Sequence, residues 1–219
     1  KNVKNTGEIA SGDKISAKKL ENSGTAATSS DISVSDSLVN HNGGNIEGKN
    51  VEVKGPELRN AGKISADNVK AKVNEVINSG QVHSSRDVDF DTQKLTNTGE
   101  ILAVNDVNSA DADVTNNGKI ASNNRILLDN SKIANTGEIL SGDISMQNAQ
   151  KFDNTGTIKA NNTVLTTTQD INLTGNLHGE QRLVISGRNI TNNGNTTGTG
   201  LIQITSNDFT NNRDLSSDT

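Results

Sequence analysis

The sequence contains no cysteine, tryptophan or tyrosine, and it has one proline in 219 residues. Without cysteine, neither disulfide bonds nor thiolate metal sites stabilise the protein. No run of about 18 apolar residues occurs, so no segment is expected to cross a membrane as a helix. The net charge of −5 provides no basic stripe for a phosphate backbone, and nucleic acid is not expected as a partner.

Apolar residues are also scarce, since they make up 30% of the sequence and only Phe90, Phe152 and Phe209 are aromatic. So low a content is typical of disordered chains, which bury too little apolar surface to offset the entropy of ordering. Two observations favour an ordered protein instead. The net charge is small, and the apolar residues are mostly Ile, Val and Leu at regular intervals, as in β-strands. All three Phe residues fall at inward positions of this pattern.

A short motif, Asn-x-Gly-x-Ile, recurs through the whole sequence. Between Asn97 and Asn154 its step is 19 residues every time, and nearer the N-terminus the step varies between 17 and 20. We expect each occurrence to start one coil of a repeat structure, twelve in all. The expected starts are Asn5, Asn22, Asn42, Asn60, Asn78, Asn97, Asn116, Asn135, Asn154, Leu173, Asn192 and Asn211.

Within a coil, apolar residues recur near positions 5, 11, 13 and 18, as Ile120, Ile126, Leu128 and Ile133 illustrate. This spacing predicts three strands per coil, and such segments are too short and too rich in Gly and Asn for helices. Strands this short must pair with their equivalents in the coils before and after. The sequence therefore predicts an all-β, parallel β-helix in which residues 1–219 form one segment. Eleven steps of about 4.8 Å between the twelve coils give a rod of roughly 53 Å.

The Asn and Gly of the motif are predicted to build one corner of each coil. Stacked Asn side chains can hydrogen-bond amide to amide along the rod and also satisfy backbone groups of the turn. We expect this ladder at Asn60, Asn78, Asn97, Asn116, Asn135, Asn154 and Asn192. The Gly is expected to adopt a positive φ that a side chain would penalise, at Gly62, Gly80, Gly99, Gly118, Gly137, Gly156, Gly175 and Gly194. The residue after it, such as Glu100, Lys119 or Glu138, is expected to stack outside with alternating charge.

Coils of 19 residues with Asn-x-Gly-x-Ile resemble the haemagglutinin repeats of filamentous haemagglutinin and of the related contact-dependent growth inhibition exoproteins. The resemblance covers essentially the whole sequence. It implies a right-handed parallel β-helix, export by two-partner secretion through an outer-membrane transporter, and display on the surface of a Gram-negative bacterium. It also implies an adhesin, or a stalk that presents a receptor-binding or toxin region to a receptor or glycan on a host or neighbouring cell.

The sequence departs from that family's pattern at several places. Pro56 is the only proline, so the Asn-Pro motifs of the family's N-terminal secretion domain are missing. Leu173 replaces a motif Asn, and Arg213 replaces a motif Gly. No signal-peptide pattern opens the sequence. We therefore expect an internal fragment of a longer rod, with neighbouring coils of the same protein at both ends.

The densest acidic cluster is Asp87-Val88-Asp89-Phe90-Asp91. Strand alternation predicts that the two apolar residues point inward and that the carboxylates of Asp87, Asp89 and Asp91 point outward, with Asp106 one coil further on. Such a face could bind a basic receptor surface or a divalent cation. It could equally be a solvated face that keeps strands from pairing wrongly.

No catalytic residue, metal site or cofactor is expected. Polysaccharide-active β-helix enzymes need clustered carboxylates, or an Arg with Ca²⁺ ligands, on one face. His83 and His178 share a coil position but lie five coils apart, His41 lies elsewhere in its coil, and all three are expected to be exposed. The expected function is a structural or adhesive stalk, with a receptor-recognition segment or a polysaccharide-active enzyme as the alternatives.

Overall fold

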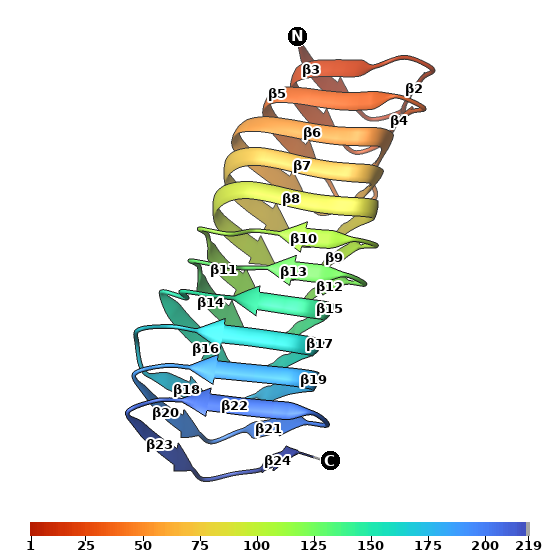
Figure 1. Cartoon of the computed structure of the whole chain (residues 1–219). Helices are drawn as coiled ribbons and strands as arrows, with labels where there is room; N and C mark the ends of the chain where they lie inside the picture. Colours follow the sequence, from red (N-terminus) through yellow and green to blue (C-terminus); the bar gives the residue numbers. More distant parts are fainter. Residues whose placement is uncertain (218–219) are drawn as a thin grey trace.

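The computed structural model describes residues 1–217, which form a rod of β-strands and turns (Figure 1). The polypeptide winds through about 11 coils of about 19 residues each, so the predicted parallel β-helix is confirmed. Twelve corners bound these turns, and eleven of them lie at the positions expected from the sequence. None of the described residues forms a helix long and apolar enough to cross a membrane.

Each coil has three faces, which we number from the strand that ends at the corner Asn. The first face contains β1 (Asn2–Asn5), β11 (Asp113–Asn116), β14 (Lys132–Asn135), β16 (Lys151–Asn154), β18 (Ile171–Leu173), β20 (Asn189–Asn192) and β23 (Asp208–Asn211). The second face follows the corner Gly and contains β2 (Glu8–Ser11), β4 (Thr25–Thr28), β9 (Glu100–Ala103), β12 (Lys119–Ser122), β21 (Asn195–Gly198) and β24 (Leu215–Ser217). The third face completes the coil and contains β10 (Asp106–Asn108), β13 (Arg125–Leu127) and β22 (Leu201–Thr205).

Other strands continue across a corner. Strands β3 (Ile15–Asn22) and β5 (Asp31–Asn40) join the third face to the first, and β15 (Glu138–Met146), β17 (Thr157–Thr166) and β19 (Asn176–Ser186) join the second face to the third. Strands β6 (Asn45–Asn60), β7 (Lys63–Asn78) and β8 (Gln81–Asn97) run through a whole coil. The equivalent strands of successive coils pair in parallel, as β7 does with β8 and β12 with β15.

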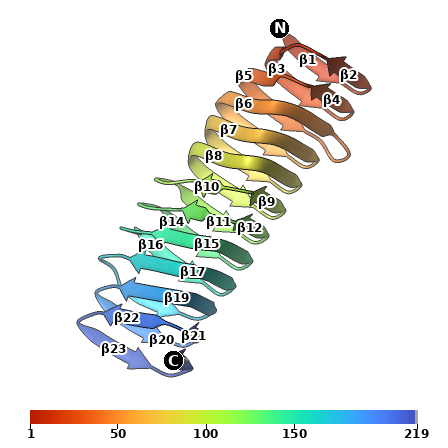
Figure 2. The same cartoon turned by 45° about the vertical axis from the view of Figure 1, so that its right-hand side comes forward.

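The coils wind in a right-handed sense. In Figure 1 the strands of the third face cross the front from right to left, and the polypeptide returns behind them as it descends from the N-terminus to the C-terminus. Figure 2 shows the same stack from another side, without an interruption between the first and last coils. Each coil therefore touches only the coil before and the coil after it, which is the arrangement of a solenoid.

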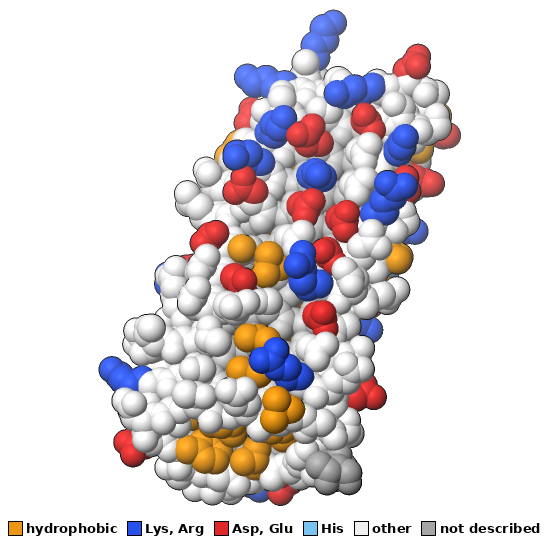
Figure 3. All heavy atoms as spheres, in the orientation of Figure 1, with side chains coloured by type: hydrophobic (Ala, Val, Ile, Leu, Met, Phe, Trp, Pro, Cys, Tyr) orange, Lys and Arg blue, Asp and Glu red, His pale blue; other side chains and the backbone are white. Residues whose placement is uncertain are grey.

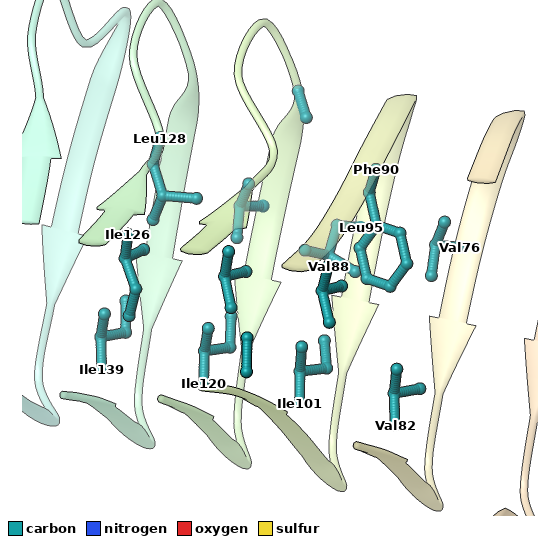
Figure 4. Packing of buried hydrophobic residues seen from close by; sticks show 14 of the residues in the cluster. Val76, Val82, Val88, Phe90, Leu95, Ile101, Ile120, Ile126, Leu128 and Ile139 are labelled. Atoms are coloured by element: carbon teal, nitrogen blue, oxygen red, sulfur yellow. The ribbon is translucent and has the colours of Figure 1, made fainter. Parts of the chain in front are cut away.

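The core is a narrow column of aliphatic side chains. Ile120, Ile126 and Leu128 are fully buried, at the coil positions that the sequence pattern indicated. Parallel pairing in register places equivalent side chains in rows, and Figure 4 shows Ile101, Ile120 and Ile139 in one such row. Burying one such side chain contributes about 1.5–3 kcal/mol, and every coil repeats the gain. A few apolar residues per coil therefore suffice, which explains how so polar a protein folds.

Two of the three aromatic residues are buried and the third is not. Phe90 and Phe152 are buried, as predicted. The prediction for Phe209 is wrong, because its side chain is 39% exposed. Phe209 pairs in register with the buried Ile190, but no later coil among the described residues covers it. Figure 3 shows hydrophobic side chains gathered at this end of the rod.

One predicted coil start is also wrong. The segment Asn42-Gly43-Gly44-Asn45-Ile46 fits the motif, but Asn40 is the residue that enters the corner at this level. Gly44 serves as the corner Gly, since its carbonyl accepts the Lys63 amide across the coil at 2.8 Å. Three residues therefore separate the corner Asn from the corner Gly where other coils have one. The motif alone does not distinguish Asn40 from Asn42 as the corner residue. The structure distinguishes them, because the side chain of Asn40 is the one that points into the corner.

Candidate functional surface

The corner Asn side chains form a hydrogen-bonded ladder along the rod. Nδ2 of Asn97 donates to Oδ1 of Asn116 at 2.8 Å, and Asn116 donates to Asn135 at 2.7 Å. The unbroken part of the ladder joins Asn5, Asn22, Asn40, Asn60, Asn78, Asn97, Asn116, Asn135 and Asn154, and a second part joins Asn192 to Asn211. The structure thus places all seven expected ladder residues in it.

Each ladder amide also satisfies the backbone of the corner. Besides its bond to Asn116, Nδ2 of Asn97 lies 3.2 Å from the carbonyl oxygen of Gly99 and 3.1 Å from that of Lys119. One N–H therefore points along the rod, and the other serves the two carbonyls. Asn97 and Asn116 are fully buried. Unpaired polar groups at such a site would cost about 1–3 kcal/mol each, so the ladder is a structural requirement of the corner.

The ladder has one gap. Leu173 occupies the corner position after Asn154 and is buried, at 2% exposure. Leu173 offers no amide acceptor, so Nδ2 of Asn154 keeps only the two carbonyl bonds that every ladder amide makes, to Gly156 at 3.4 Å and to Asn176 at 3.2 Å. On the other side of the gap, Oδ1 of Asn192 accepts the hydroxyl of Thr196 at 3.0 Å. The N–H of Asn154 that would point along the rod therefore has no side-chain acceptor among the described residues, whereas Oδ1 of Asn192 is satisfied by a hydroxyl.

The corner glycines lie where the sequence placed them, but the expected positive φ is wrong. Among the glycines of the described residues, only Gly43 and Gly55 have a positive φ. A Cβ on Gly118 would lie 2.7 Å from the carbonyl carbon of Thr98, one coil earlier. The same overlap with the preceding coil occurs at Gly62, Gly80, Gly99, Gly118, Gly137, Gly156, Gly175 and Gly194. The corner needs Gly because stacked coils approach too closely for a side chain.

Positive φ angles occur at a different corner, between the third and first faces. Asp111, Asn130 and Asn148 have φ values of 59°, 57° and 53°. Asp and Asn adopt this left-handed conformation more readily than other residues with a side chain. The backbone turn at this corner thus depends on Asp and Asn. The sequence motif gave no indication of it, because the motif marks the corner between the first and second faces.

The acidic face on β8 is largely neutralised by the coil before it. Asp89 and Asp91 point outward, as expected, and are in register with Lys70 and Lys72. Nζ of Lys70 lies 3.6 Å from Oδ2 of Asp89, and Nζ of Lys72 lies 2.9 Å from Oδ2 of Asp91. The side chain of Asn108, on the coil after, donates to Oδ1 of Asp89 at 2.6 Å.

Asp87 and Asp106 are likewise engaged within the rod. Oδ1 of Asp87 accepts the backbone amide of Asp106 at 3.2 Å, and Nη2 of Arg125 lies 3.0 Å from Oδ2 of Asp106. No group of three or more His, Cys, Asp or Glu side chains within residues 1–217 is arranged to hold a metal ion. Figure 3 shows charges of both signs interspersed over the third face rather than one acidic patch.

Asp87 and Asp106 belong to a second polar stack, which we call the outer ladder and which the sequence analysis did not predict. It follows the corner between the second and third faces and consists of Asp31, Asn50, Asn68, Asp87, Asp106, Arg125, Asp143 and Asn162. Asn50 donates to Asp31 at 2.7 Å, Asn68 to Asn50 at 2.8 Å, and Asn162 to Asp143 at 2.7 Å. A recurrence of Asp, Asn or Arg six or seven places after the corner Gly was the available signal.

The residues after the corner Gly stack in register on the second face. Lys119 pairs with Glu100 on one side and with Glu138 on the other, so the expected alternation of charge is present. The atoms of these side chains do not meet in an ion pair within 4.0 Å in the described structure. Glu100 has Nε2 of His83 at 3.5 Å instead. The stack is therefore a solvated charge pattern.

Ion pairs on the first face lower the pKa of two carboxyl groups. Nζ of Lys94 donates to Oε1 of Glu75 at 2.8 Å, and this bond, together with the charges of Lys94 and Arg59, lowers the pKa of Glu75 below 4.5. Arg188 donates two hydrogen bonds of 2.8 Å to Asp170, and they lower the pKa of that carboxyl below 3.8. Both pairs join successive coils, so they add to the cohesion of the rod.

The histidines do not form a site. His41 is exposed, as expected, with Nε2 3.1 Å from Oε1 of Glu21. The expected exposure is wrong for His83 and His178, which are half-buried on the second face between the side chains of neighbouring coils. Nδ1 of His178 lies 2.8 Å from the hydroxyl of Thr197. None of these neighbours is a nucleophile oriented by a His and a carboxylate together.

No family model, no curated protein and no solved structure matches this protein.

Proposed function

We propose that this protein is a structural and adhesive stalk segment of a large exoprotein on the surface of a Gram-negative bacterium. In this proposal an outer-membrane transporter of the two-partner type exports the protein. The stalk then holds a receptor-binding or toxin region at a distance from the cell, where that region meets a receptor or glycan. The observation that supports the proposal most is the continuous ladder from Asn5 to Asn154, which links successive coils without a break.

Continuous linkage suits a spacer because it makes length additive. Every coil adds about 4.8 Å, and backbone pairing joins it to the next coil. The corner ladder from Asn5 to Asn154 and the outer ladder from Asp31 to Asn162 add further links between successive coils. Bending the rod would have to stretch these hydrogen bonds on one face. A rod of this kind resists bending and keeps its two ends at a fixed distance, which is what a stalk requires.

The surface also favours a spacer over a recognition segment. Outward-facing charges are paired between coils, as Lys132 with Asp113 at 3.0 Å and Lys94 with Glu75 at 2.8 Å. Charges that are already paired within the rod offer less to a partner, since binding would have to break these contacts. The polar surface of the described coils is consistent with a solvated rod that does not aggregate through its faces.

The test removes length without breaking the corner ladder. Deleting residues 97–153 from the exoprotein on its own bacterial surface takes out three whole coils and brings Asn154 to the position of Asn97. The rod should shorten by roughly 14 Å, and delivery or adhesion should fall while the amount of surface protein stays the same. A matched control keeps the length and changes the outer surface: Lys70→Ser, Lys72→Ser, Asp89→Ser and Asp91→Ser together should leave adhesion unchanged.

The two variants separate the alternatives. If the surface variant abolishes adhesion and the shortened rod does not, the segment recognises a receptor and the stalk proposal fails. Incubating the purified protein with surface polysaccharides, with released sugar fragments measured, addresses the enzymatic alternative. Fragment release above that of a heat-unfolded sample would also overturn the proposal.

A further inference from the structure

The sequence contains three Asn-Gly pairs, and the structure holds one of them unlike the other two. They are Asn42-Gly43, Asn117-Gly118 and Asn193-Gly194. An Asn-Gly pair can rearrange without an enzyme when the Gly backbone nitrogen attacks Cγ of the Asn. The reaction needs a free Gly N–H, a free Asn side chain and a backbone that can rotate. Whether each pair meets these needs can be determined from its hydrogen bonds.

Asn42-Gly43 occupies the middle of a tight turn in the three-residue loop that interrupts the corner after Asn40. The amide of Gly44 donates to the carbonyl oxygen of His41 at 2.9 Å, and Gly43 has a φ of 79°, as the third residue of a type II turn does. Asn42 and Gly43 are both exposed. Within residues 1–217, neither the amide of Gly43 nor the side chain of Asn42 has a hydrogen-bond partner.

The other two pairs lie in regular corners, where stacking fixes them. The amide of Gly118 donates to the carbonyl oxygen of Asn97 at 3.2 Å, and Oδ1 of Asn117 accepts the hydroxyl of Thr136 at 2.8 Å. The pair is thereby tied to the coil before and to the coil after it. Its backbone rotates only if the corner opens.

At Asn193-Gly194 the restraint is tighter. The amide of Gly194 donates to Oδ1 of Asn192 at 3.3 Å. The side chain of Asn193 donates to Asn172 and accepts from Asn212, each at 2.8 Å. Both the nucleophile and the group it would attack are therefore engaged.

We propose that Asn42 is a site of spontaneous deamidation in the folded rod, and that the corners protect Asn117 and Asn193. The Gly43 nitrogen loses its proton and bonds to Cγ of Asn42. The bond between Cγ and Nδ2 of Asn42 breaks, and Nδ2 leaves as ammonia after taking up a proton. The cyclic imide that remains is opened by water at either carbonyl, which gives aspartate or isoaspartate at position 42.

The product changes the loop in two ways. It introduces a carboxylate next to His41, which already pairs with Glu21. Its isoaspartate form also adds a methylene to the backbone of the turn. The corner ladder runs through Asn40 and not through Asn42, so the rod itself should not lose stability. The modification would mark the age of a rod without weakening it.

Peptide mapping by mass spectrometry tests the proposal on the intact protein. After incubation at mildly alkaline pH, the tryptic peptide with Asn42 should show replacement of NH2 by OH at least about tenfold faster than those with Asn117 and Asn193, since each of those corners must first break hydrogen bonds. In denaturant the three sites should react at similar rates, because the sequence at each is Asn-Gly. Equal rates in the folded protein would overturn the proposal.

Two variants complete the test. Asn42→Gln should abolish the reaction at position 42 and leave Asn117 and Asn193 unaffected, since the longer side chain forms the cyclic intermediate poorly. Asn42→Asp reproduces one product, and its thermal midpoint should equal that of the unmodified protein. If Asn42→Asp lowers the midpoint as much as a corner substitution does, then Asn42 is part of the rod's framework and the inference is wrong.

Discussion

Nδ2 of Asn116 donates a 2.7 Å hydrogen bond to Oδ1 of Asn135, one coil further along the rod. Asn116→Leu removes this donor and also the Oδ1 that accepts from Asn97, so two buried hydrogen bonds of the ladder are lost. We expect the free energy of unfolding to fall by about 2–4 kcal/mol. Urea unfolding measures it, and Asn117→Leu, the same change at the exposed neighbour, should stay within about 0.5 kcal/mol. Equal effects would mean that the ladder contributes nothing.

The corner glycines allow a second comparison within one motif. Gly118 stacks on the preceding coil, whereas a Cβ on Gly7 meets nothing within 4 Å. Gly118→Ala should therefore lower the unfolding free energy by about 1–3 kcal/mol, because the coils must separate to fit the methyl group. When residues 1–219 are tested alone, Gly7→Ala should leave it unchanged or raise it by about 0.4–1 kcal/mol. Similar losses at both positions would favour a requirement for backbone freedom over close approach.

A repeat period determines some features of this fold and leaves others open. A fixed step of 19 residues with Ile, Val and Leu at fixed positions determines the coil, the inward rows and the corner. The period does not determine how closely the coils approach, so the role of Gly118 was misassigned. It also does not decide between Asn40 and Asn42, since both precede a Gly within a few residues and only the direction of the side chain separates them.

The candidate surface was less predictable than the fold. A run such as Asp87 to Asp91 looks like an acidic patch when it is considered alone. Its partners, Lys70 and Lys72, precede it by 19 residues. Charge compensation in a solenoid therefore has to be assessed across coils, at the period of the repeat. The outer ladder was missed for the same reason, because its Asp, Asn and Arg residues share a position but not an identity.

Acid should weaken the rod through Glu75. Its hydrogen bond to Lys94 keeps the pKa of the folded state below 4.5, so the unfolded state binds more protons as the pH falls. The stabilisation is present above about pH 4.5 and is lost as the pH drops through the folded-state pKa. Because both side chains are partly exposed, the effect should be below about 1 kcal/mol.

Thermal midpoints between pH 7 and pH 3 measure this effect. Lys94→Gln should make the midpoint less dependent on pH in that range, because it removes the group that lowers the pKa of Glu75. Lys63→Gln, on the second face, serves as the control and should leave the pH dependence as it is. An unaltered acid response in Lys94→Gln would show that the pair does not contribute to stability.

Calcium should not stabilise the acidic face. Asp89 and Asp91 already have Lys70 and Lys72 as partners, and a bound cation would have to displace them. A ligand that binds only the folded state raises the thermal midpoint. We expect the midpoint in calcium chloride to equal that in sodium chloride of the same ionic strength, which screens exposed pairs equally. A rise specific to calcium would show a cation site on this face.

Filling the gap at Leu173 tests whether this corner can still hold a hydrogen-bonding side chain. Leu173→Asn loses about 1.5–3 kcal/mol of apolar burial, but it places an acceptor in front of Asn154 and a donor in front of Asn192. Two regained buried hydrogen bonds offset most of that loss, so the unfolding free energy should change by less than about 1 kcal/mol. Leu183→Asn puts the same amide in the fully buried core of the third face, where no ladder exists, and should cost about 3 kcal/mol or more. Equal losses would mean that the corner after Asn154 has adapted to Leu and no longer accepts the ladder.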